Sequence, residues 1–526
     1  MNRRNFLKAA ALAVVASGCA GNFPKPNKNK PNIILIMADD MGYSDIGCFG
    51  AEIKTPNLDK LGFGGKRFTQ FYSMAKCNPT RSALLTGLFM GKKNAANAIP
   101  LAKQLSKAGY YTAMSGKEHF DGWVPKSCYA ENAFDDSFKY WAINTYFAKP
   151  DGKFSNKFKL NGNVIEEKDL PVNNPPLYKT DLATDYGLEF LDNAKKADKP
   201  FFLYMPYHVA HYPLQARDED IAKYRGKYKK GWDVIRQERF ERQKQLGVIG
   251  KDYKLSPPED NINKFRGPYR NNIYKYRQWD SLDENEQNEL DLEMAVFAAM
   301  VDRMDQNIGR LLNKLDEMKV RDNTLIMFLC DNGSCPYDSN KDFSIPPGPA
   351  ESYRSLCAAW ANVGNTPFRY YKQYGHEGGA KSNFIANWPG IIKSGFCHDV
   401  SHLVDIYPTL LDITATQYLA TVKNKPMPRL DGNSMLPLFK GQNRNEPEII
   451  ISGYSDRFRM VRFADWKIVK VNGGPWQLYN LQADPTELNN LADAKKEKVK
   501  ELERKYNTWL KNNGITTVKK KKIRSQ

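Results

Sequence analysis

Cys77 begins the segment CNPTRSALLTG (residues 77–87), in which a proline, an arginine and a Thr-Gly turn follow the cysteine closely. After residue 30 the chain has seven cysteines, including Cys77. They are scattered, without the close spacing of a zinc site. Because their number is odd, one is left over from any complete pairing into disulfides. Scattered single cysteines are most often buried small apolar residues, an interpretation that suits most of these. The neighbours of Cys77 set it apart.

Acidic and amide side chains end two apolar segments. IMADD ends in Asp39 and Asp40, and LCDNG carries Asp331 and Asn332. If both segments are strands of an open α/β sheet, these side chains lie at its carboxyl edge, where such sheets bind ligands. Three carboxylates and an amide oxygen suit calcium or magnesium. Starting a turn or capping a helix is the commoner role of a single strand-end aspartate, but finding both pairs favours a metal site.

These side chains have to be positioned by strands and helices. Short, nearly continuous apolar segments at 32–40, 201–206, 324–333 and 384–389 are typical of strands in a sheet covered on both faces. Between them, residues 292–318 carry apolar side chains at three- and four-residue steps, which predicts a long amphipathic helix. The fold class is therefore α/β. From about residue 445, short alternating segments and one charged helix predict a small C-terminal α+β subdomain.

The chain has 526 residues, 41% of them hydrophobic, which is ample for a buried core. Its 78 Lys and Arg exceed its 59 Asp and Glu by 19, so the surface attracts polyanions. Nucleic acid, acidic lipid and anionic polysaccharide all remain open on charge alone. The segment 223–244 is basic too. It either attracts a polyanionic substrate or is a solvated helix with paired charges, and the opposite charges at helical spacing in IRQERFERQK favour the second interpretation.

Residues 1–30 are predicted to be a leader and linker. MNRRNFLKAAALAVVASGCAG combines Arg3 and Arg4 with an apolar run too short to span a bilayer and then small residues, as export signals do. RRNFLK resembles a twin-arginine signal, and ASGC resembles a lipobox in which Cys19 becomes lipidated. An ordinary signal peptide is the alternative. We therefore expect an exported bacterial protein, periplasmic or an outer-membrane lipoprotein, attached to a membrane only through Cys19.

CNPTRSALLTG resembles the signature of type I sulfatases, C-x-P-x-R followed by a Leu-Thr-Gly turn, in which a formylglycine-generating enzyme oxidises the cysteine. Similar segments follow in the family's order: PNIILIMADDMGYSDIGCFG, GKEHF, AHYPLQA, NTPFRYYKQYGHEGG and LYNLQADPTELNNLA. The insertion GKYKKGWDVIRQERF is typical of the bacterial arylsulfatase branch. The resemblance implies the mixed sheet of the alkaline phosphatase superfamily, sandwiched by helices. It also implies a catalytic domain at 31–444 and a C-terminal subdomain with a basic tail at 445–526.

The resemblance further implies a nucleophile made from Cys77. Formylglycine is hydrated to a diol, and one hydroxyl, beside one divalent cation such as Ca²⁺, attacks sulfur. Deprotonating the second hydroxyl expels sulfate and restores the aldehyde. A serine or an unmodified cysteine has no second hydroxyl and so cannot release sulfate in this way. The implied cation ligands are Asp39, Asp40, Asp331, Asn332 and the residue at position 77.

Three basic residues have implied roles at the nucleophile. Arg81 stabilises its deprotonated form, since guanidinium is charged at any working pH. Lys117 contacts the sulfate and the modified residue, and His119, with a pKa near neutrality, is the base for expelling sulfate. Lys117 and His119 are expected at alternate positions of one strand, facing one cleft. Without the resemblance, a solvated arginine and a chance Lys-x-His pattern would be the simpler interpretations.

The remaining implied roles concern the leaving group and the attack. His211 and Lys372 neutralise the departing alkoxide, one of them donating the proton, and Asp331 is the general base for attack. His208 has no counterpart in the family pattern and is interpreted as structural. After the Glu-Gly-Gly of HEGG the family commonly has Arg-x-Pro, whereas this chain has AKSNF, which leaves the substrate contacts of that loop open.

Three functions follow from these residues. The first is hydrolysis of sulfate esters, on sulfated polysaccharides or oligosaccharides. The second is a phosphonate or phosphodiester hydrolase of the same superfamily, because such enzymes share the metal site. The third is a non-catalytic binder of sulfated glycans, which would follow if Cys77 stays unmodified. The expected partners are a sulfated carbohydrate and the maturation enzyme, and not nucleic acid.

Overall fold

The structure is a computed structural model that describes residues 30–515 except 90–94, 121–123, 142–144, 148–157, 167–168, 171–175, 260–275, 420, 423 and 454–457. The predicted leader with Cys19 and the basic end of the chain lie outside the described residues. Among the described residues, no helix is both long and apolar enough to cross a membrane. The seven described cysteines are all buried and none of them forms a disulfide bond, as expected for small apolar residues.

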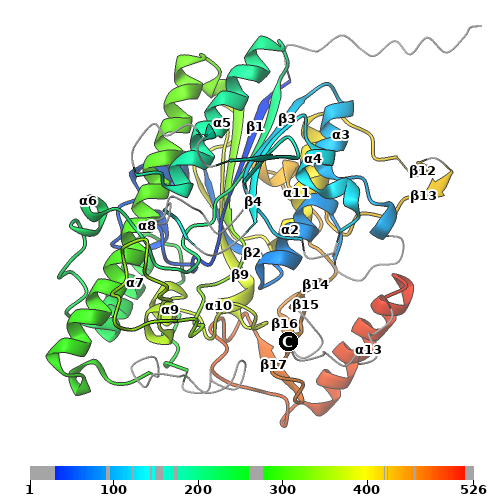
Figure 1. Cartoon of the computed structure of the whole chain (residues 1–526). Coiled ribbons are helices and arrows are strands. Elements are labelled where there is room, and N and C mark those ends of the chain that lie inside the picture. Colours follow the sequence, from blue (N-terminus) through cyan, green and yellow to red (C-terminus); the bar gives the residue numbers. More distant parts are fainter. Residues whose placement is uncertain are drawn as a thin grey trace, which may run out of the picture.

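A large mixed sheet forms the centre of the molecule (Figure 1). Its eleven described strands follow the order β10-β2-β9-β8-β1-β7-β3-β4-β5-β6, with β11 beside β2. Five neighbouring strands are parallel, and β9 runs antiparallel to β8 and β2. The strands are β1 Asn32–Ala38, β2 Lys66–Tyr72, β3 Tyr111–Glu118, β4 Asp136–Trp141, β5 Phe158–Leu160, β6 Asn163–Ile165, β7 Phe201–Pro206, β8 Thr324–Cys330, β9 Lys381–Asn387, β10 Gly395–Cys397 and β11 Ser401–His402.

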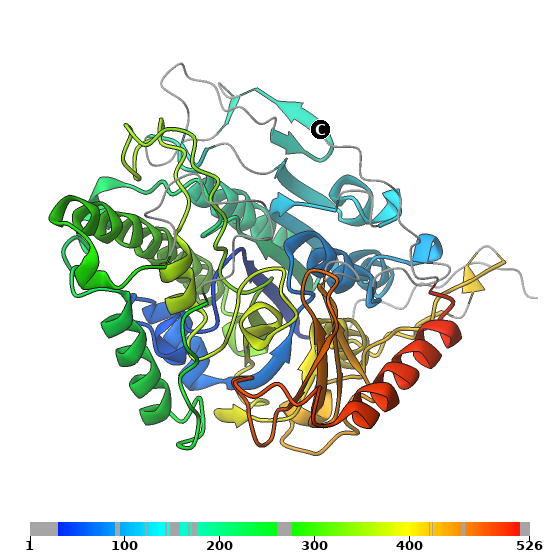
Figure 2. The same cartoon turned by 90° about the horizontal axis from the view of Figure 1, so that it is seen from below.

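Helices cover both faces of this sheet (Figures 1 and 2). Alternate residues of β1 show why: Ile34 and Ile36 join the core with α1, α5 and α8, whereas Ile33 and Leu35 join the core with α2, α3 and α11. The predicted helix at 292–318 corresponds to α8 from its ninth residue onward, and α8 starts at a capping box formed by Asp283 and Glu286. These helices are α1 Pro56–Gly64, α2 Cys77–Thr86, α3 Leu101–Lys107, α5 Lys179–Lys196, α8 Glu284–Glu317 and α11 Ile406–Ile413. The α/β sandwich predicted from the sequence is confirmed.

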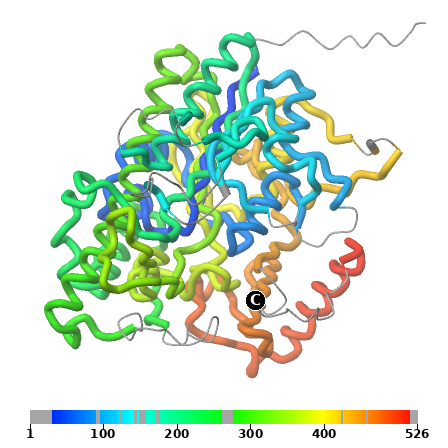
Figure 3. Tube along the Cα trace, viewed as in Figure 1, coloured from blue at the N-terminus to red at the C-terminus, as the bar shows by residue number. Residues whose placement is uncertain are grey.

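A second, four-stranded antiparallel sheet lies near the C-terminus, with α13 along its outer side (Figures 2 and 3). It consists of β14 Ile450–Ser452, β15 Met460–Phe463, β16 Trp466–Lys470 and β17 Trp476–Asn480, and α13 covers Lys496–Asn512. One face of this sheet, including Val461 and Ile468, packs in the same core as Leu502 of α13. The other face, including Met460, packs against Tyr72 of β2. The C-terminal sheet is thus buried against the large sheet, and the 444/445 domain boundary stays a prediction.

The basic segment at 223–244 is tied into the fold. Most of it is α7, Trp232–Gln245. Arg239 is buried and pairs with Asp45 and, over 2.8 Å, with Glu52, while Arg236 donates to the Ser256 hydroxyl over 2.7 Å. Both arginines are buried and bound to other segments, which differs from the solvated, internally paired helix of the second interpretation. The remaining elements are α4 Ala130–Ala133, α6 Asp218–Ile221, α9 Ala358–Gly364, α10 Glu377–Ala380, α12 Leu436–Phe439, β12 Thr421–Val422 and β13 Lys425–Pro426.

Candidate active site

The two acidic pairs lie side by side at the carboxyl ends of β1 and β8. These strands are parallel neighbours whose last residues are in register, so Asp39 and Asp331 follow at the same level. The Asp40 backbone N–H donates to Asp331 Oδ1 over 3.3 Å, and Asn332 Nδ2 donates to Asp40 Oδ1 over 2.8 Å. All four side chains are buried. The fold therefore brings together acids that are almost 300 residues apart in the sequence.

Cys77 is the first residue of α2 and lies beside these acids. Its Sγ and one carboxylate oxygen each of Asp39 and Asp331 lie within 4.8 Å of one another. Thr80, in the same helix, donates its hydroxyl to the Asp331 carbonyl over 2.7 Å and so attaches α2 to the end of β8. Sequence reasoning missed Thr80, although it lies inside CNPTR, because a threonine there carries no signal of its own.

The Cys77 side chain lies where an anion is stabilised. Its Sγ is 3.3 Å from His119 Nδ1, and the residue is 2% exposed. Burial alone raises the pKa of the thiol, but the Lys372 ammonium and His119 outweigh burial and lower the pKa to about 6. His119 follows β3 directly, one residue beyond the strand that was predicted to include it.

Two buried lysines reach the acids from different elements. Lys117, in β3, donates from Nζ to Asp39, and Lys372, in the loop between α9 and α10, donates from Nζ to Asp40. The Lys372 backbone N–H donates to the Ser334 carbonyl over 3.1 Å, which holds this loop against the segment after β8. Both ammonium groups are almost fully shielded from solvent, so their electrostatic interactions with the other groups of the site are only weakly screened.

Arg81, in the same helix as Cys77, is the third cation. Its Nη2 lies 3.0 Å from Asp331 Oδ2 and 3.3 Å from Asp39 Oδ2. Burial raises the pKa of Asp39, but Lys117 and Arg81 outweigh it and hold that pKa well below its usual range. Arg81 is therefore a buried partner of the acids and not the solvated surface group that an arginine in a loop would suggest.

The acidic side chains fit a divalent cation. Burial and the neighbouring Asp39 raise the pKa of Asp331 well above its usual value, so the protein's own cations do not compensate all three carboxylates. Asp39 Oδ1, Asp40 Oδ2 and Asn332 Oδ1 are buried and accept no hydrogen bond from any described residue. Buried oxygens without partners are costly, and hard oxygens are the ligands that calcium and magnesium take.

His211 and His208 lie next to each other but in different surroundings. His211 Nε2 is 3.5 Å from Asp40 Oδ2, and Nδ1 is 2.7 Å from the Tyr212 carbonyl, to which it donates. Burial and Lys117 lower the pKa of His211 to about 3, so its imidazole is neutral. His208 is stacked on the far side, with ring centroids 5.0 Å apart. The structure thus brings His211 to the acids and places His208 behind it.

A matching family model agrees with this geometry. The model described as sulfatase matches residues 31–416, which is more than half of the chain. The chain belongs to the sulfatase family. The model described as the C-terminal part of N-sulphoglucosamine sulphohydrolase matches residues 367–513 of this sulfatase. The protein is therefore a sulfuric ester hydrolase.

Similar proteins extend over nearly the whole sulfatase. An arylsulfatase of Klebsiella aerogenes is 30% identical over 478 residues, which cover 83% of this chain and 98% of that protein. An N-acetylglucosamine-6-O-sulfatase of Bacteroides thetaiotaomicron is 25% identical and covers 91% of this chain and 86% of its own length. The crystal structure of Ps i-CgsB, 25% identical, superimposes with a TM-score of 0.63 over 91% of this chain and 92% of that one.

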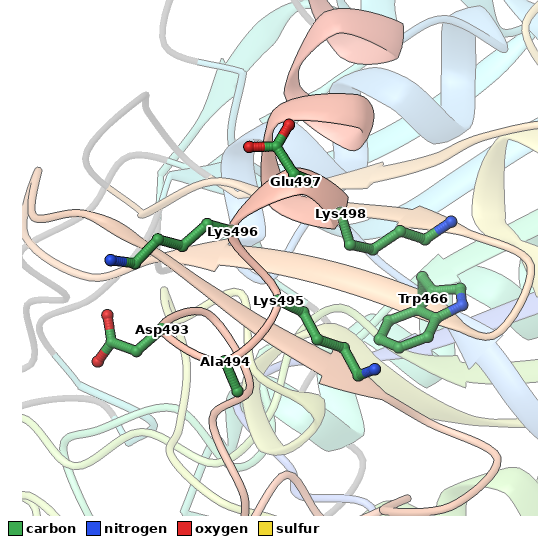
Figure 4. A pocket seen from close by; sticks show the side chains of 7 residues that line it. All are labelled: Trp466, Asp493, Ala494, Lys495, Lys496, Glu497 and Lys498. Atoms are coloured by element: carbon green, nitrogen blue, oxygen red, sulfur yellow. The ribbon is translucent and has the colours of Figure 1, made fainter.

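A pocket of about 650 Å³ lies elsewhere, in the C-terminal part of the sulfatase (Figure 4). It is formed by Trp466 and by residues 493–498 at the start of α13. Lys495 and Lys498 flank the Trp466 ring, and Lys498 Nζ lies 5.4 Å from the ring centroid. None of the sequence-predicted site residues lines this pocket.

Proposed function

We propose that the sulfatase hydrolyses sulfate esters of sulfated polysaccharides or oligosaccharides, with Cys77, converted to formylglycine, as the nucleophile. The observation that carries the proposal is the convergence of Cys77 with Asp39 and Asp331, within 4.8 Å, at a site whose buried oxygens lack partners. Relatives named for sulfated amino sugars support the substrate class. The maturation enzyme that converts Cys77 is a further partner under this proposal.

A cation site fits the same residues. Asp39, Asp40, Asp331 and Asn332 would hold one Ca²⁺ together with the side chain at position 77. The cation would supply Lewis-acid stabilisation of negative charge on the nucleophile and the sulfate. Asp331 lies beside position 77, and a bound cation would keep its carboxylate ionised, so that it could accept the proton of the attacking hydroxyl.

The basic residues then have distinct roles. Arg81 and Lys117 orient the sulfate and stabilise charge at position 77, and His119, 3.3 Å from Cys77 Sγ, takes the proton whose loss expels sulfate. Lys372 neutralises the leaving oxygen. Because neutral His211 donates from Nδ1 to a carbonyl, its Nε2 presents a lone pair, and Lys372 is the proton carrier of the pair.

The test compares two substrate classes in one preparation. Intact mass gives the fraction of Cys77 that has been converted, and released sulfate is measured on aryl sulfates and on a panel of sulfated oligosaccharides. Turnover of an aryl phosphodiester in parallel tests the alternative, which the relatives do not favour. Faster phosphodiester than sulfate turnover, or complete absence of conversion in an active enzyme, would contradict the proposal.

The proposed location is outside the cytoplasm, in the periplasm or as an outer-membrane lipoprotein anchored at Cys19. The leader motifs support it, and exported enzymes meet polymeric sulfated substrates. Replacing Cys19 with alanine and following the enzyme in membrane and soluble fractions separates a lipid anchor from an ordinary cleaved signal.

A further inference from the structure

The short helix α10, Glu377–Ala380, touches the active site through its backbone. The Gly333 N–H, in the residue after Asn332, donates to the Gly379 carbonyl over 3.1 Å. The Ser73 N–H, at the start of the segment that leads to α2, donates to the Ala380 carbonyl over 2.8 Å. Helix α10 therefore contacts two of the three segments that carry the proposed cation ligands, the one after β8 and the one that leads to Cys77.

Helix α10 also holds the loop that carries Lys372. The Gly378 N–H donates to the Arg369 carbonyl over 2.9 Å. Helix α10 packs tightly against this loop. A Cβ on Gly378 would lie 2.3 Å from the Arg369 carbonyl oxygen, and a Cβ on Gly379 would lie 2.2 Å from the Tyr371 carbonyl oxygen. A shift of α10 by a fraction of an ångström must therefore move the Lys372 loop with it.

The side chain of Glu377, the first residue of α10, holds this helix in place. Its carboxylate accepts from Lys467 over 2.6 Å and from Tyr72 over 2.9 Å and lies 2.9 Å from Lys381 Nζ. Its backbone N–H donates to Glu487 over 2.7 Å. All of these residues are buried. Arg462 donates to the Tyr72 hydroxyl over 2.6 Å and completes this group, which we call the Glu377 cluster: Tyr72, Glu377, Lys381, Arg462, Lys467 and Glu487.

Lys467 joins this cluster to the C-terminal sheet. It lies in β16, is fully buried, and also lies 2.8 Å from Glu487. It therefore bridges the two acids of the cluster. Lys470, three residues later in the same strand, is half-buried and stacks over Trp476 at 4.4 Å, and it makes no described contact with the cluster. Lys470 is thus a matched control for Lys467.

We propose that Lys467 is a positioning residue for the sulfatase reaction: by holding Glu377 it fixes α10 and places Lys372 at the leaving oxygen. The motifs HEGG and DPTELNNLA, which supply Glu377 and Glu487, thereby gain a role that the catalytic residues alone do not explain. This inference rests on the proposed function, which assigns Lys372 its role.

The test is a double-mutant cycle with Lys467→Met, Lys372→Ala and the double variant, with Lys470→Met as control. kcat and KM are measured on an aryl sulfate, per molecule of converted Cys77 counted by intact mass, well below each variant's Tm. We expect Lys467→Met to lower kcat about 10- to 100-fold, as a misplacement of about 1 Å does. In the Lys372→Ala background it should lower kcat less than twofold further, because both act through one group. Lys467→Arg, which keeps the charge, should recover most of the activity.

The outcomes separate the two proposals. A normal kcat in Lys467→Met with a lowered Tm would mean a purely structural role, and an additive loss in the double variant would mean an effect outside Lys372; either overturns the inference while the proposed function stands. A normal kcat in Lys372→Ala would overturn the inference together with the role proposed for Lys372, while the proposed nucleophile at Cys77 would stand. If Lys467→Met yields no folded protein, Glu377→Gln with Lys467→Met removes both charges together and is measured against the same criteria.

Discussion

The sulfatase buries two groups of charged residues that differ in how well they are satisfied. In the Glu377 cluster, both carboxylate oxygens of Glu377 accept hydrogen bonds or ion pairs within the protein. At the strand ends, one oxygen each of Asp39, Asp40 and Asn332 accepts none from the described residues. Buried polar atoms stabilise a fold when satisfied and cost free energy when not. Glu377 is thus satisfied within the protein, whereas the strand-end oxygens remain available for a further ligand.

One acid from each group, Glu377 and Asp331, shows a contrast in its pKa. Burial raises the pKa of Glu377, but Lys381 and Lys467 outweigh it and hold that pKa far below its usual value. Asp331 shows the opposite result, because burial and Asp39 together raise its pKa well above the usual value. A carboxylate that the protein itself cannot keep charged is a place where an added cation has the greatest effect.

The largest expected effect comes from removing the nucleophile. Cys77→Ala should reduce turnover at least about 1,000-fold, since no remaining group can form the covalent bond to sulfur. Cys77→Ser should restore activity only in a host that converts serine. The Tm of the alanine variant should stay within a few degrees of the wild type. Substantial sulfate release by that variant would mean that the strand-end group is not the reaction centre.

The next effect is the response to the cation. After treatment with a chelator, the enzyme should lose activity, and Ca²⁺ should restore it and raise the Tm. Calcium at 100 times its Kd stabilises the folded state by about 2.7 kcal/mol. Asp40→Asn should lose most of this Tm increase, measured by scanning calorimetry, because one charged ligand is gone. An equal increase in the wild type and in Asp40→Asn would place the cation elsewhere.

Stability should separate the two groups in the metal-free enzyme. Lys467→Met leaves Glu377 buried with one partner fewer and should lower the free energy of unfolding by about 3–5 kcal/mol. Asp331→Asn removes a carboxyl group whose pKa is already raised. This substitution should therefore lower the free energy of unfolding far less, or even increase it. Denaturant unfolding of both variants, with Lys470→Met as the control, measures the difference. Equal losses of stability in Lys467→Met and Asp331→Asn would contradict the contrast between the two groups of buried charges.

The smallest effect is expected from the exposed lysines of the basic segment. Neutralising Lys227, Lys229 and Lys230 should change kcat/KM less than about twofold, and equally for a sulfated polymer and a small aryl sulfate, because exposed charges are screened by salt. Assays at low and moderate salt check this. A selective, salt-dependent loss on the polymer would make this segment a substrate-attracting surface. Arg239, buried against Glu52, is scaffold, and its replacement by methionine should destabilise the fold instead.

Much of the architecture could be predicted from local sequence pattern. The strands at 32–40, 201–206 and 324–333 are apolar on both faces because helices cover both sides, and the structure contains them as β1, β7 and β8. The helix at 292–318 was found from its apolar spacing, but its start at Glu284 was missed, because the polar first turns of α8 show no such spacing. The CNPTR segment was visible through its resemblance to a family signature, and the strand-end acids because two such pairs follow two apolar segments.

The sequence by itself determined which residues are proposed to carry the chemistry: a cysteine before Pro-x-Arg, two acidic strand ends, and a Lys-x-His. Only the tertiary structure decided how they meet, because the order of strands in a sheet is not written in any local pattern. It placed β8 beside β1, which joins Asp39 to Asp331. It also placed Lys467 under Glu377. A lysine in the short strand WKIVK gives no sign of its partner, since a buried charge finds its counter-charge through space, here 90 residues away along the chain.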